Sequence, residues 1–268
     1  MNYADIDAMN WSTLKHMDVS PKYFQYRLRH PVPRKLAYLI GNGSHCHVLE
    51  RDDFGNRYAV CDVVRNAKQT PYKEWLALNA GKEALKPAEM AAIRAMSHAV
   101  DSHPEARKLL TGGRAEEVVQ WVDPITGIKC KGRLDYIQPD KFTDYKTTRR
   151  LEQRGFEYDC ADFLYHGQMA FYHDGAIAAG VLPKDAQLPH IVAVDKPPPK
   201  EVQWEHDVTV YVMSWEAFEA GRELYRRLLR RYVECTEAGI WPGMAPGLRE
   251  LGLPRRARVA EDDGNPFE

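Results

Sequence analysis

Cysteine is scarce in this sequence, and long apolar runs are absent. The cysteines are odd in number, widely spaced and never in a C-x-x-C pair: Cys46, Cys61, Cys130, Cys160 and Cys235. Zinc and iron–sulfur sites need clustered thiolates, so this spacing argues against both, and unpaired thiols indicate a reducing, cytoplasmic compartment. No stretch approaches the ~20 apolar residues of a membrane span, and residues 1–11 are too acidic and polar for a signal peptide. We therefore expect a cytoplasmic protein without a membrane partner.

A net excess of either charge is also missing. The chain has 37 Lys and Arg residues against 38 Asp and Glu residues, for a formal charge of −1. Cations are nevertheless concentrated at residues 146–154, 222–231 and 255–258. A protein that holds DNA in a local groove need not be basic overall, so the balance permits a nucleic-acid partner without requiring one. The arginines of 222–231 wrap around their expected helix, which favours a solvated face over a DNA clamp.

Length and composition favour one folded unit. With 268 residues, of which 44% are hydrophobic, the chain can bury one sizeable core, and a split into two domains is possible but not required. We expect a single domain over residues 1–253, mainly helical at 1–110, with a sheet core and its flanking helices at 111–253. Residues 254–268 are expected to form a disordered tail.

The hydrophobic periodicity changes along the chain. Ser12 and the Ser20-Pro21 pair are expected to begin two short helices. Helical spacing recurs further on, at residues 34–50, 87–99, 161–179 and 215–238. β-Branched and aromatic residues favour strands at 116–122, 129–137, 142–146, 190–194 and 202–213. This order predicts an α/β protein with a central mixed β-sheet flanked by helices and preceded by a helical N-terminal region.

Two acids and a lysine are predicted to meet on neighbouring strands. Side chains alternate along a strand, so Asp144 and Lys146 point to the same face. If the strands pair as a hairpin through residues 138–141, Asp135 lies beside Asp144. Two adjacent carboxylates repel each other unless a cation lies between them, and Mg²⁺ prefers such oxygen ligands. A bound Mg²⁺ would activate water and polarise a phosphodiester, with Lys146 orienting or deprotonating that water.

A simpler interpretation is open for this motif. D-x-K alone occurs by chance in many proteins, where the acid and the lysine form a solvated ion pair. The surroundings favour a functional site, because Lys131 and Arg133 share the face of Asp135 by the same alternation. That face would meet both phosphate and metal, so Lys131 and Arg133 are candidate DNA contacts.

Further motifs carry a family resemblance. Gly132 to Asp135 form G-x-x-D before the D-x-K strand, and an earlier helix carries Gly41, His45, Leu49 and Glu50 in a G-x-x-x-H-x-x-x-L-E pattern. The following helix carries Q-x-x-x-Y. Together these resemble the RecB-type branch of the PD-(D/E)xK nucleases, most closely the RecE-type exonucleases (exodeoxyribonuclease VIII-like), over most of the chain.

The resemblance implies roles for individual residues. His45, Asp135, Asp144 and the backbone carbonyl of Tyr145 would hold one or two Mg²⁺ ions, for which Mn²⁺ would substitute. Gly41, one turn before His45, would leave room for it. A further acid would come from Glu116 or Glu117, between which the sequence does not decide. The hydroxyls of Thr147 and Thr148 would contact DNA phosphate, and Gln168 and Tyr172 would contact DNA or steady the catalytic lysine.

Simpler interpretations stand beside these roles. His45 and His47 would cap a helix if the downstream acids were absent, and Tyr172 is as typical of a core aromatic as of a functional residue. The tail at 261–268 faintly resembles the acidic, phenylalanine-ended tip of single-strand binding proteins, although Glu268 moves the free carboxylate off Phe267.

The resemblance implies an exodeoxyribonuclease that digests linear double-stranded DNA from its ends. The expected direction is 5′ to 3′, leaving a 3′ single-stranded tail for annealing-type DNA recombination in a phage or prophage context. The expected partners are DNA ends, a single-strand annealing protein, and further copies of the chain in a ring-shaped trimer or tetramer. Two other functions remain open: a structure- or sequence-directed endonuclease on the same core, and a catalytically silent DNA-binding subunit.

Overall fold

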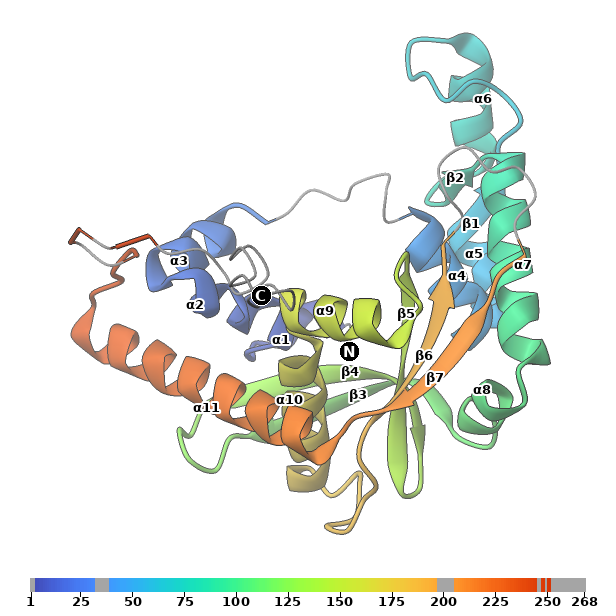
Figure 1. Cartoon of the computed structure of the whole chain (residues 1–268). Coiled ribbons are helices and arrows are strands. Elements are labelled where there is room, and N and C mark those ends of the chain that lie inside the picture. Colours follow the sequence, from blue (N-terminus) through green and yellow to red (C-terminus); the bar gives the residue numbers. More distant parts are fainter. Residues whose placement is uncertain (1–2, 32–38, 197–204, 245–246, 249, 252–268) are drawn as a thin grey trace, which may run out of the picture.

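A five-stranded mixed β-sheet forms the centre of the computed structural model, which describes residues 3–31, 39–196, 205–244, 247–248 and 250–251 (Figure 1). Its spatial order is β3 (Arg114–Val122), β4 (Lys129–Gln138), β5 (Lys141–Thr148), β6 (His190–Asp195) and β7 (Val208–Val212). Neighbouring strands are antiparallel except β5 and β6, which are parallel. Helices cover both faces, which confirms the predicted α/β fold. Within the described ranges, no helix has both the length and the apolar character needed to cross a membrane.

One face of the sheet carries the larger hydrophobic core. It is covered by α9 (Gln153–Asp162), α10 (Tyr165–Ala178) and α11 (Trp215–Ala238), and by α1 (Trp11–Leu14), α2 (His16–Val19) and α3 (Pro21–Arg29) near the N-terminus (Figure 1). Close approach of α10 to the sheet depends on two glycines. The ring of Trp121 lies against Gly175, and the ring of Tyr172 lies against Gly132.

The opposite face packs on a second set of helices. These are α4 (Leu39–Leu49), α7 (Pro87–Ser102) and α8 (Pro104–Leu109). Alternation along β6 separates the two cores, because Ile191 belongs to the first core and Val192 to the second. Beyond α4 lie α5 (Arg51–Arg57), α6 (Thr70–Leu78) and a small parallel sheet of β1 (Tyr58–Val60) and β2 (Glu83–Leu85). A short 3₁₀ helix, Tyr3–Asp5, precedes α1.

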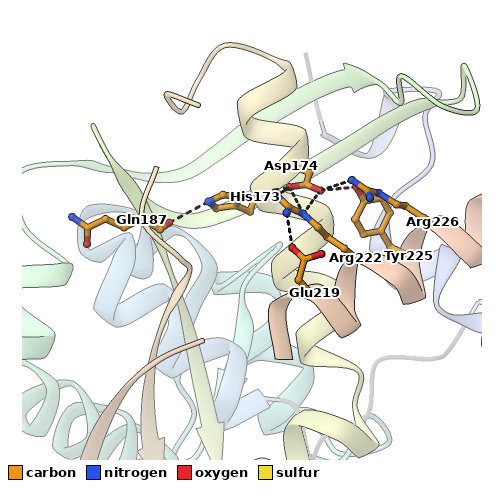
Figure 2. A network of polar contacts seen from close by, with 7 residues as sticks. All are labelled: His173, Asp174, Gln187, Glu219, Arg222, Tyr225 and Arg226. Carbon is orange, nitrogen blue, oxygen red and sulfur yellow. Dashed lines mark hydrogen bonds and ion pairs between the residues drawn. The ribbon is translucent and has the colours of Figure 1, made fainter. Parts of the chain in front are cut away.

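A partly buried ionic network connects α10 to α11 (Figure 2). The Asp174 carboxylate accepts hydrogen bonds from the Arg222 guanidinium at 2.7–3.1 Å and from the Tyr225 hydroxyl at 2.7 Å. Arg222 also pairs with Glu219 at 2.7 Å. Next to Asp174, the His173 ring contacts the carbonyl oxygen of Gln187 at 3.1 Å. The network therefore fixes the orientation of α10, the helix that packs on β3 and β4.

Most predicted elements are confirmed, with shifted boundaries. Ser20 caps α3 by accepting from the Tyr23 amide at 3.1 Å, as predicted. Ser12 as a helix cap is wrong, because Asn10 caps α1 by accepting from the Thr13 amide at 2.8 Å. The helix predicted at 161–179 is observed as α10 at 165–178, because Leu164 adopts a left-handed conformation with φ of 58° just before it. The sequence did not predict α9 at 153–162, which ends before Leu164.

Other differences concern the ends of elements and short elements. The strand predicted at 202–213 is observed at 208–212, and 202–204 lie outside the described residues, as do 34–38 of the predicted helix at 34–50 and the expected tail at 254–268. The sequence did not predict five short elements: α5, α6, α8, β1 and β2. Each of these helices has nine residues or fewer, which leaves little periodicity to detect.

Candidate active site

A gap between β4 and β5 positions the predicted acids. The two strands pair as the expected hairpin from Tyr136↔Thr143 to Gln138↔Lys141, so Asp135 and Asp144 stand at the next step, where the ladder opens. The Asp135 carboxylate occupies the opening and accepts a hydrogen bond from the Tyr145 amide at 2.8 Å. The N–H and C=O of one strand residue point to the same edge, so the Tyr145 carbonyl also faces this gap.

Three potential ligands converge beside the gap from three different elements. His45 of α4 places Nε2 at 3.1 Å from Asp135 Oδ2 and 3.5 Å from Glu116 Oε1 of β3. One ligand atom from each of these side chains lies within 4.8 Å of the others. The structure thus selects Glu116 over Glu117, whose carboxylate pairs with Arg114 at 3.1 Å. We call His45, Glu116 and Asp135 the triad.

Glu116 has an unusual backbone conformation at the point where its side chain joins His45 and Asp135. Its φ is 54°, which is rare for a residue other than glycine and costs about 1–3 kcal/mol. The Glu116 Oε1 atom is buried and makes no hydrogen bond with the described residues. Such an oxygen, held next to an imidazole and a second carboxylate, suits a divalent cation, which takes oxygen and imidazole ligands together.

The pKa shifts of the triad residues indicate a site that favours a positive charge. Burial works against protonation of His45, but the Asp135 and Glu116 carboxylates outweigh it and raise the pKa of His45 to about 9. Burial, aided by the Asp135 charge, raises the pKa of Glu116 to about 7. At neutral pH, a proton on His45 therefore carries the positive charge that the two carboxylates require.

Asp144 and Lys146 form a second cluster on the same face of β5, as the alternation predicted. The Lys146 ammonium lies 2.5 Å from Asp144 Oδ2 and 4.9 Å from the centre of the Tyr165 ring. Gln168 of α10 donates from Nε2 to Asp144 Oδ1 at 3.3 Å. Asp144 is 1% exposed, so the solvated ion pair considered from sequence alone is excluded.

The charge states of this pair follow from their surroundings. Burial, with the Asp135 charge, raises the pKa of Asp144 to about 6 despite the neighbouring ammonium. Burial opposes the charge on Lys146, but the Asp144 and Asp135 carboxylates outweigh it and raise the pKa of Lys146. Lys146 is therefore a charged hydrogen-bond donor at neutral pH, which favours orienting a water over deprotonating it.

Asp144 differs from the expected arrangement in one respect. Among the described residues, the potential ligands that lie close together are those of the triad, and Asp144 is not one of them. The Asp144 carboxylate is held instead by Lys146 and Gln168. It still feels the Asp135 charge across the gap. A shared ion between Asp135 and Asp144 therefore stays a prediction.

Tyr172 and Gly41 contact other groups than expected. Tyr172 is 8% exposed and packs in the core against Gly132, so it cannot contact DNA in this conformation. Its nearest functional neighbour is Gln168, whose side chain is hydrogen-bonded to it. A Cβ at Gly41 would lie 3.2 Å from Thr147 Oγ1, so Gly41 makes room for Thr147, where the sequence suggested room for His45.

The candidate DNA-contacting residues differ in how far their side chains are exposed to solvent. Arg133 is about half exposed at 48%, pairs with Glu116 Oε2 at 2.7 Å and remains available to phosphate. Lys131 is wrong as a DNA contact in this conformation, because its buried ammonium donates to the Tyr3 and Ile6 carbonyls at 2.9 and 2.7 Å. Thr148 is also buried, donating to Asp159 Oδ2 at 2.8 Å.

A cleft of about 610 Å³ opens beside the triad and is lined by His45, Glu116 and Arg133. Glu50 also lines it, but Arg57 binds both Glu50 oxygens at 2.7 and 2.8 Å.

The sequence did not indicate a role for Tyr165, whose ring packs against the ammonium of Lys146, the candidate catalytic lysine. Its position three residues before Gln168, one helical turn away, was the only available signal.

The fold and this site define a PDDEXK-like nuclease domain. The chain belongs to the family described as "PDDEXK-like domain of unknown function (DUF3799)", whose model matches residues 10–248. No curated protein matches the chain.

Solved structures resemble the chain at low sequence identity. A protein described as a putative exonuclease from Eubacterium rectale is 14% identical with a TM-score of 0.60, covering 94% of this chain and 91% of that chain, which shows a shared fold. A phage-related exonuclease from Haemophilus somnus is 10% identical with a TM-score of 0.34, covering 74% and 95%. An alkaline exonuclease from Laribacter hongkongensis is 14% identical with a TM-score of 0.26, covering 74% and 97%. The last two matches are too loose to support a structural argument.

Proposed function

We propose that the chain is a divalent-metal-dependent exonuclease acting on DNA. The observation that carries this proposal is the meeting of two groups at one gap in the sheet: the triad of His45, Glu116 and Asp135, and the buried Asp144–Lys146 pair. Mg²⁺ is the proposed ion, with Mn²⁺ as a substitute, because carboxylates dominate the ligand set.

The residues of the site would have different roles in phosphodiester hydrolysis. The triad would hold the ion, with Asp144 and the Tyr145 carbonyl facing the same gap. When bound, Mg²⁺ supplies a Lewis acid for the phosphate and lowers the pKa of a water. The Lys146 ammonium donates to that water and aligns it with phosphorus. Arg133, at the rim, is placed to bind the phosphate next to the cleaved bond.

The finer features of this activity rest on the resemblance to RecE-type exonucleases. They are digestion of linear duplex DNA from its ends, a 5′-to-3′ direction, and a 3′ single-stranded tail used in annealing-type recombination. A ring-shaped homo-oligomer and a single-strand annealing partner belong to the same proposal.

End-labelled DNA tests the activity. Linear duplex carrying a label at the 5′ or the 3′ end is incubated with Mg²⁺, and the released products are followed over time. We expect loss of the 5′ label as mononucleotide before loss of the 3′ label, and no nicking of covalently closed circles. Nicked circles would instead favour an endonuclease.

Matched variants assign the activity to this site. Lys146→Ala should abolish cleavage and largely spare DNA binding, whereas Lys73→Ala, an exposed lysine on α6, should change neither. Retained turnover of Lys146→Ala at saturating Mg²⁺ would reject the role of Lys146. An inactive wild-type chain that binds neither Mg²⁺ nor Mn²⁺ would favour a silent DNA-binding subunit.

A further inference from the structure

A row of aromatic and cationic side chains covers the solvent face of α2 and α3. The His16 ring meets the Tyr23 ring edge-on at 5.5 Å, and Tyr23 stacks on Tyr26 at 6.4 Å between centroids. Tyr26 in turn contacts the His30 ring at 4.6 Å. The Arg27 guanidinium lies 5.0 Å from the Tyr23 ring centre and 5.6 Å from that of Tyr26. We call these five residues the aromatic row.

The row is not part of the hydrophobic core. Its α3 members follow the i, i+3, i+4, i+7 spacing of one helix face, and Tyr26 is 52% exposed. The core side of α3 is formed by Phe24, which is 0% exposed and stacks on Trp241 at 5.7 Å. Tyr26 and His30 are exposed, and His16 and Tyr23 are partly exposed. A solvated helix face is ordinarily polar, so this row of rings suits a ligand with flat apolar faces.

The surface around the row is strongly cationic. Residues 11–30 contain the cations Lys15, Lys22, Arg27 and Arg29 against the single acid Asp18. Asp18 is itself occupied, because its carboxylate pairs with Arg227 at 3.0 Å. Rings interleaved with cations on an acid-poor surface match a polyanion whose units carry aromatic faces.

The row is linked to the active site through α1. Trp11 of α1 packs on Gly167 of α10, next to Gln168, whose amide reaches Asp144. Lys15 follows at the end of α1, and burial together with the nearby charge of Lys146 lowers its pKa. From Lys15, the chain leads directly to His16, the first member of the row.

We propose that the aromatic row binds single-stranded DNA, namely the strand adjoining the phosphate cleaved at Lys146. Bases stack on the tyrosine and histidine rings, and the cations of α3 track the backbone. Duplex DNA offers no free base faces, so the row discriminates for unpaired nucleotides. The proposal rests on the proposed nuclease function for the identity of the strand, whereas the binding surface itself is tested without cleavage.

The test is fluorescence anisotropy of a labelled oligothymidylate of about 20 nucleotides with the full chain in EDTA, where no cleavage occurs. Tyr26→Ala should weaken single-strand binding about five-fold or more, because stacking contributes a comparable factor for each base. Tyr26→Phe keeps the stacking face and should bind as the wild type. Tyr72→Ala is the matched control, since Tyr72 also stacks on a neighbour, Trp75, at 6.0 Å, but on the distant α6 (Figure 1).

Each outcome decides the proposal. Equal single-strand affinity of wild type, Tyr26→Ala and Tyr26→Phe overturns it, and so does a wild-type chain that fails to bind the oligonucleotide. An equal loss for single-stranded and duplex DNA in Tyr26→Ala also overturns it, because the row would then not distinguish unpaired bases from paired ones. A Tyr26-dependent loss for single strands in a chain that shows no nuclease activity with Mg²⁺ supports the surface and rejects the proposed function alone.

Discussion

Asp174 provides a quantitative test of how α10 is held in place. Burial opposes its ionisation, but the neighbouring His173 ring at 3.7 Å and the hydrogen bonds from Arg222 and Tyr225 outweigh burial and lower the pKa of Asp174 from 3.8 to about 2 (Figure 2). Each unit of pKa corresponds to about 1.4 kcal/mol, so ionised Asp174 stabilises the fold by ~2 kcal/mol. The side chain is 18% exposed, so solvent screening reduces this value little.

The sign of the pH dependence follows from the lowered pKa. The stabilisation is fully present above the unfolded value of 3.8 and is lost as pH falls towards about 2. In urea unfolding, Asp174→Asn should be less stable than the wild type by ~2 kcal/mol at neutral pH, and the difference should shrink below pH ~4. A difference that stays constant down to acidic pH, or no difference at neutral pH, would refute this assignment.

Three further predictions concern packing and metal binding. Gly132→Ala places a Cβ 2.9 Å from the Tyr172 ring and should lower stability by ~1–3 kcal/mol in urea unfolding, whereas Gly55→Ala, with nothing within 4 Å, should not destabilise. Chelation with EDTA should stop DNA cleavage, and added Mg²⁺ or Mn²⁺ should restore it; cleavage in EDTA would contradict metal dependence. The neighbouring carboxylates raise the pKa of His45 to about 9, and His45 must lose its proton to bind a metal ion. Mg²⁺ affinity, measured by calorimetry, should therefore rise from pH 6 to pH 9. An affinity that does not change with pH would exclude His45 as a ligand.

Local patterns predicted much of the site. Strand alternation placed Asp144 and Lys146 on one face, and the hairpin register brought Asp135 next to Asp144. These inferences succeeded because they depend on geometry that is repeated in every strand. The choice of Glu116 over Glu117 was beyond the sequence, since it depends on a left-handed backbone conformation that a strand pattern does not predict.

Contacts between distant segments account for the remaining differences. Lys131 follows the predicted alternation, but residues Tyr3 and Ile6 fold over its ammonium and remove it from solvent. Asp144 is likewise drawn to Gln168, a residue 24 positions further along the chain. Tertiary packing of this kind overrides local pattern and is visible only once the chain is folded.

The position of a bound divalent ion is the most direct test of the proposed metal site at the triad. Crystals of the chain soaked in Mn²⁺ can be measured for anomalous scattering, which locates the ion without reference to activity. We predict a peak in the gap between β4 and β5, within bonding distance of His45, Glu116 and Asp135. Metal binding by the triad would be contradicted if Mn²⁺ bound elsewhere, or if these three side chains held no ion at a saturating concentration of Mn²⁺.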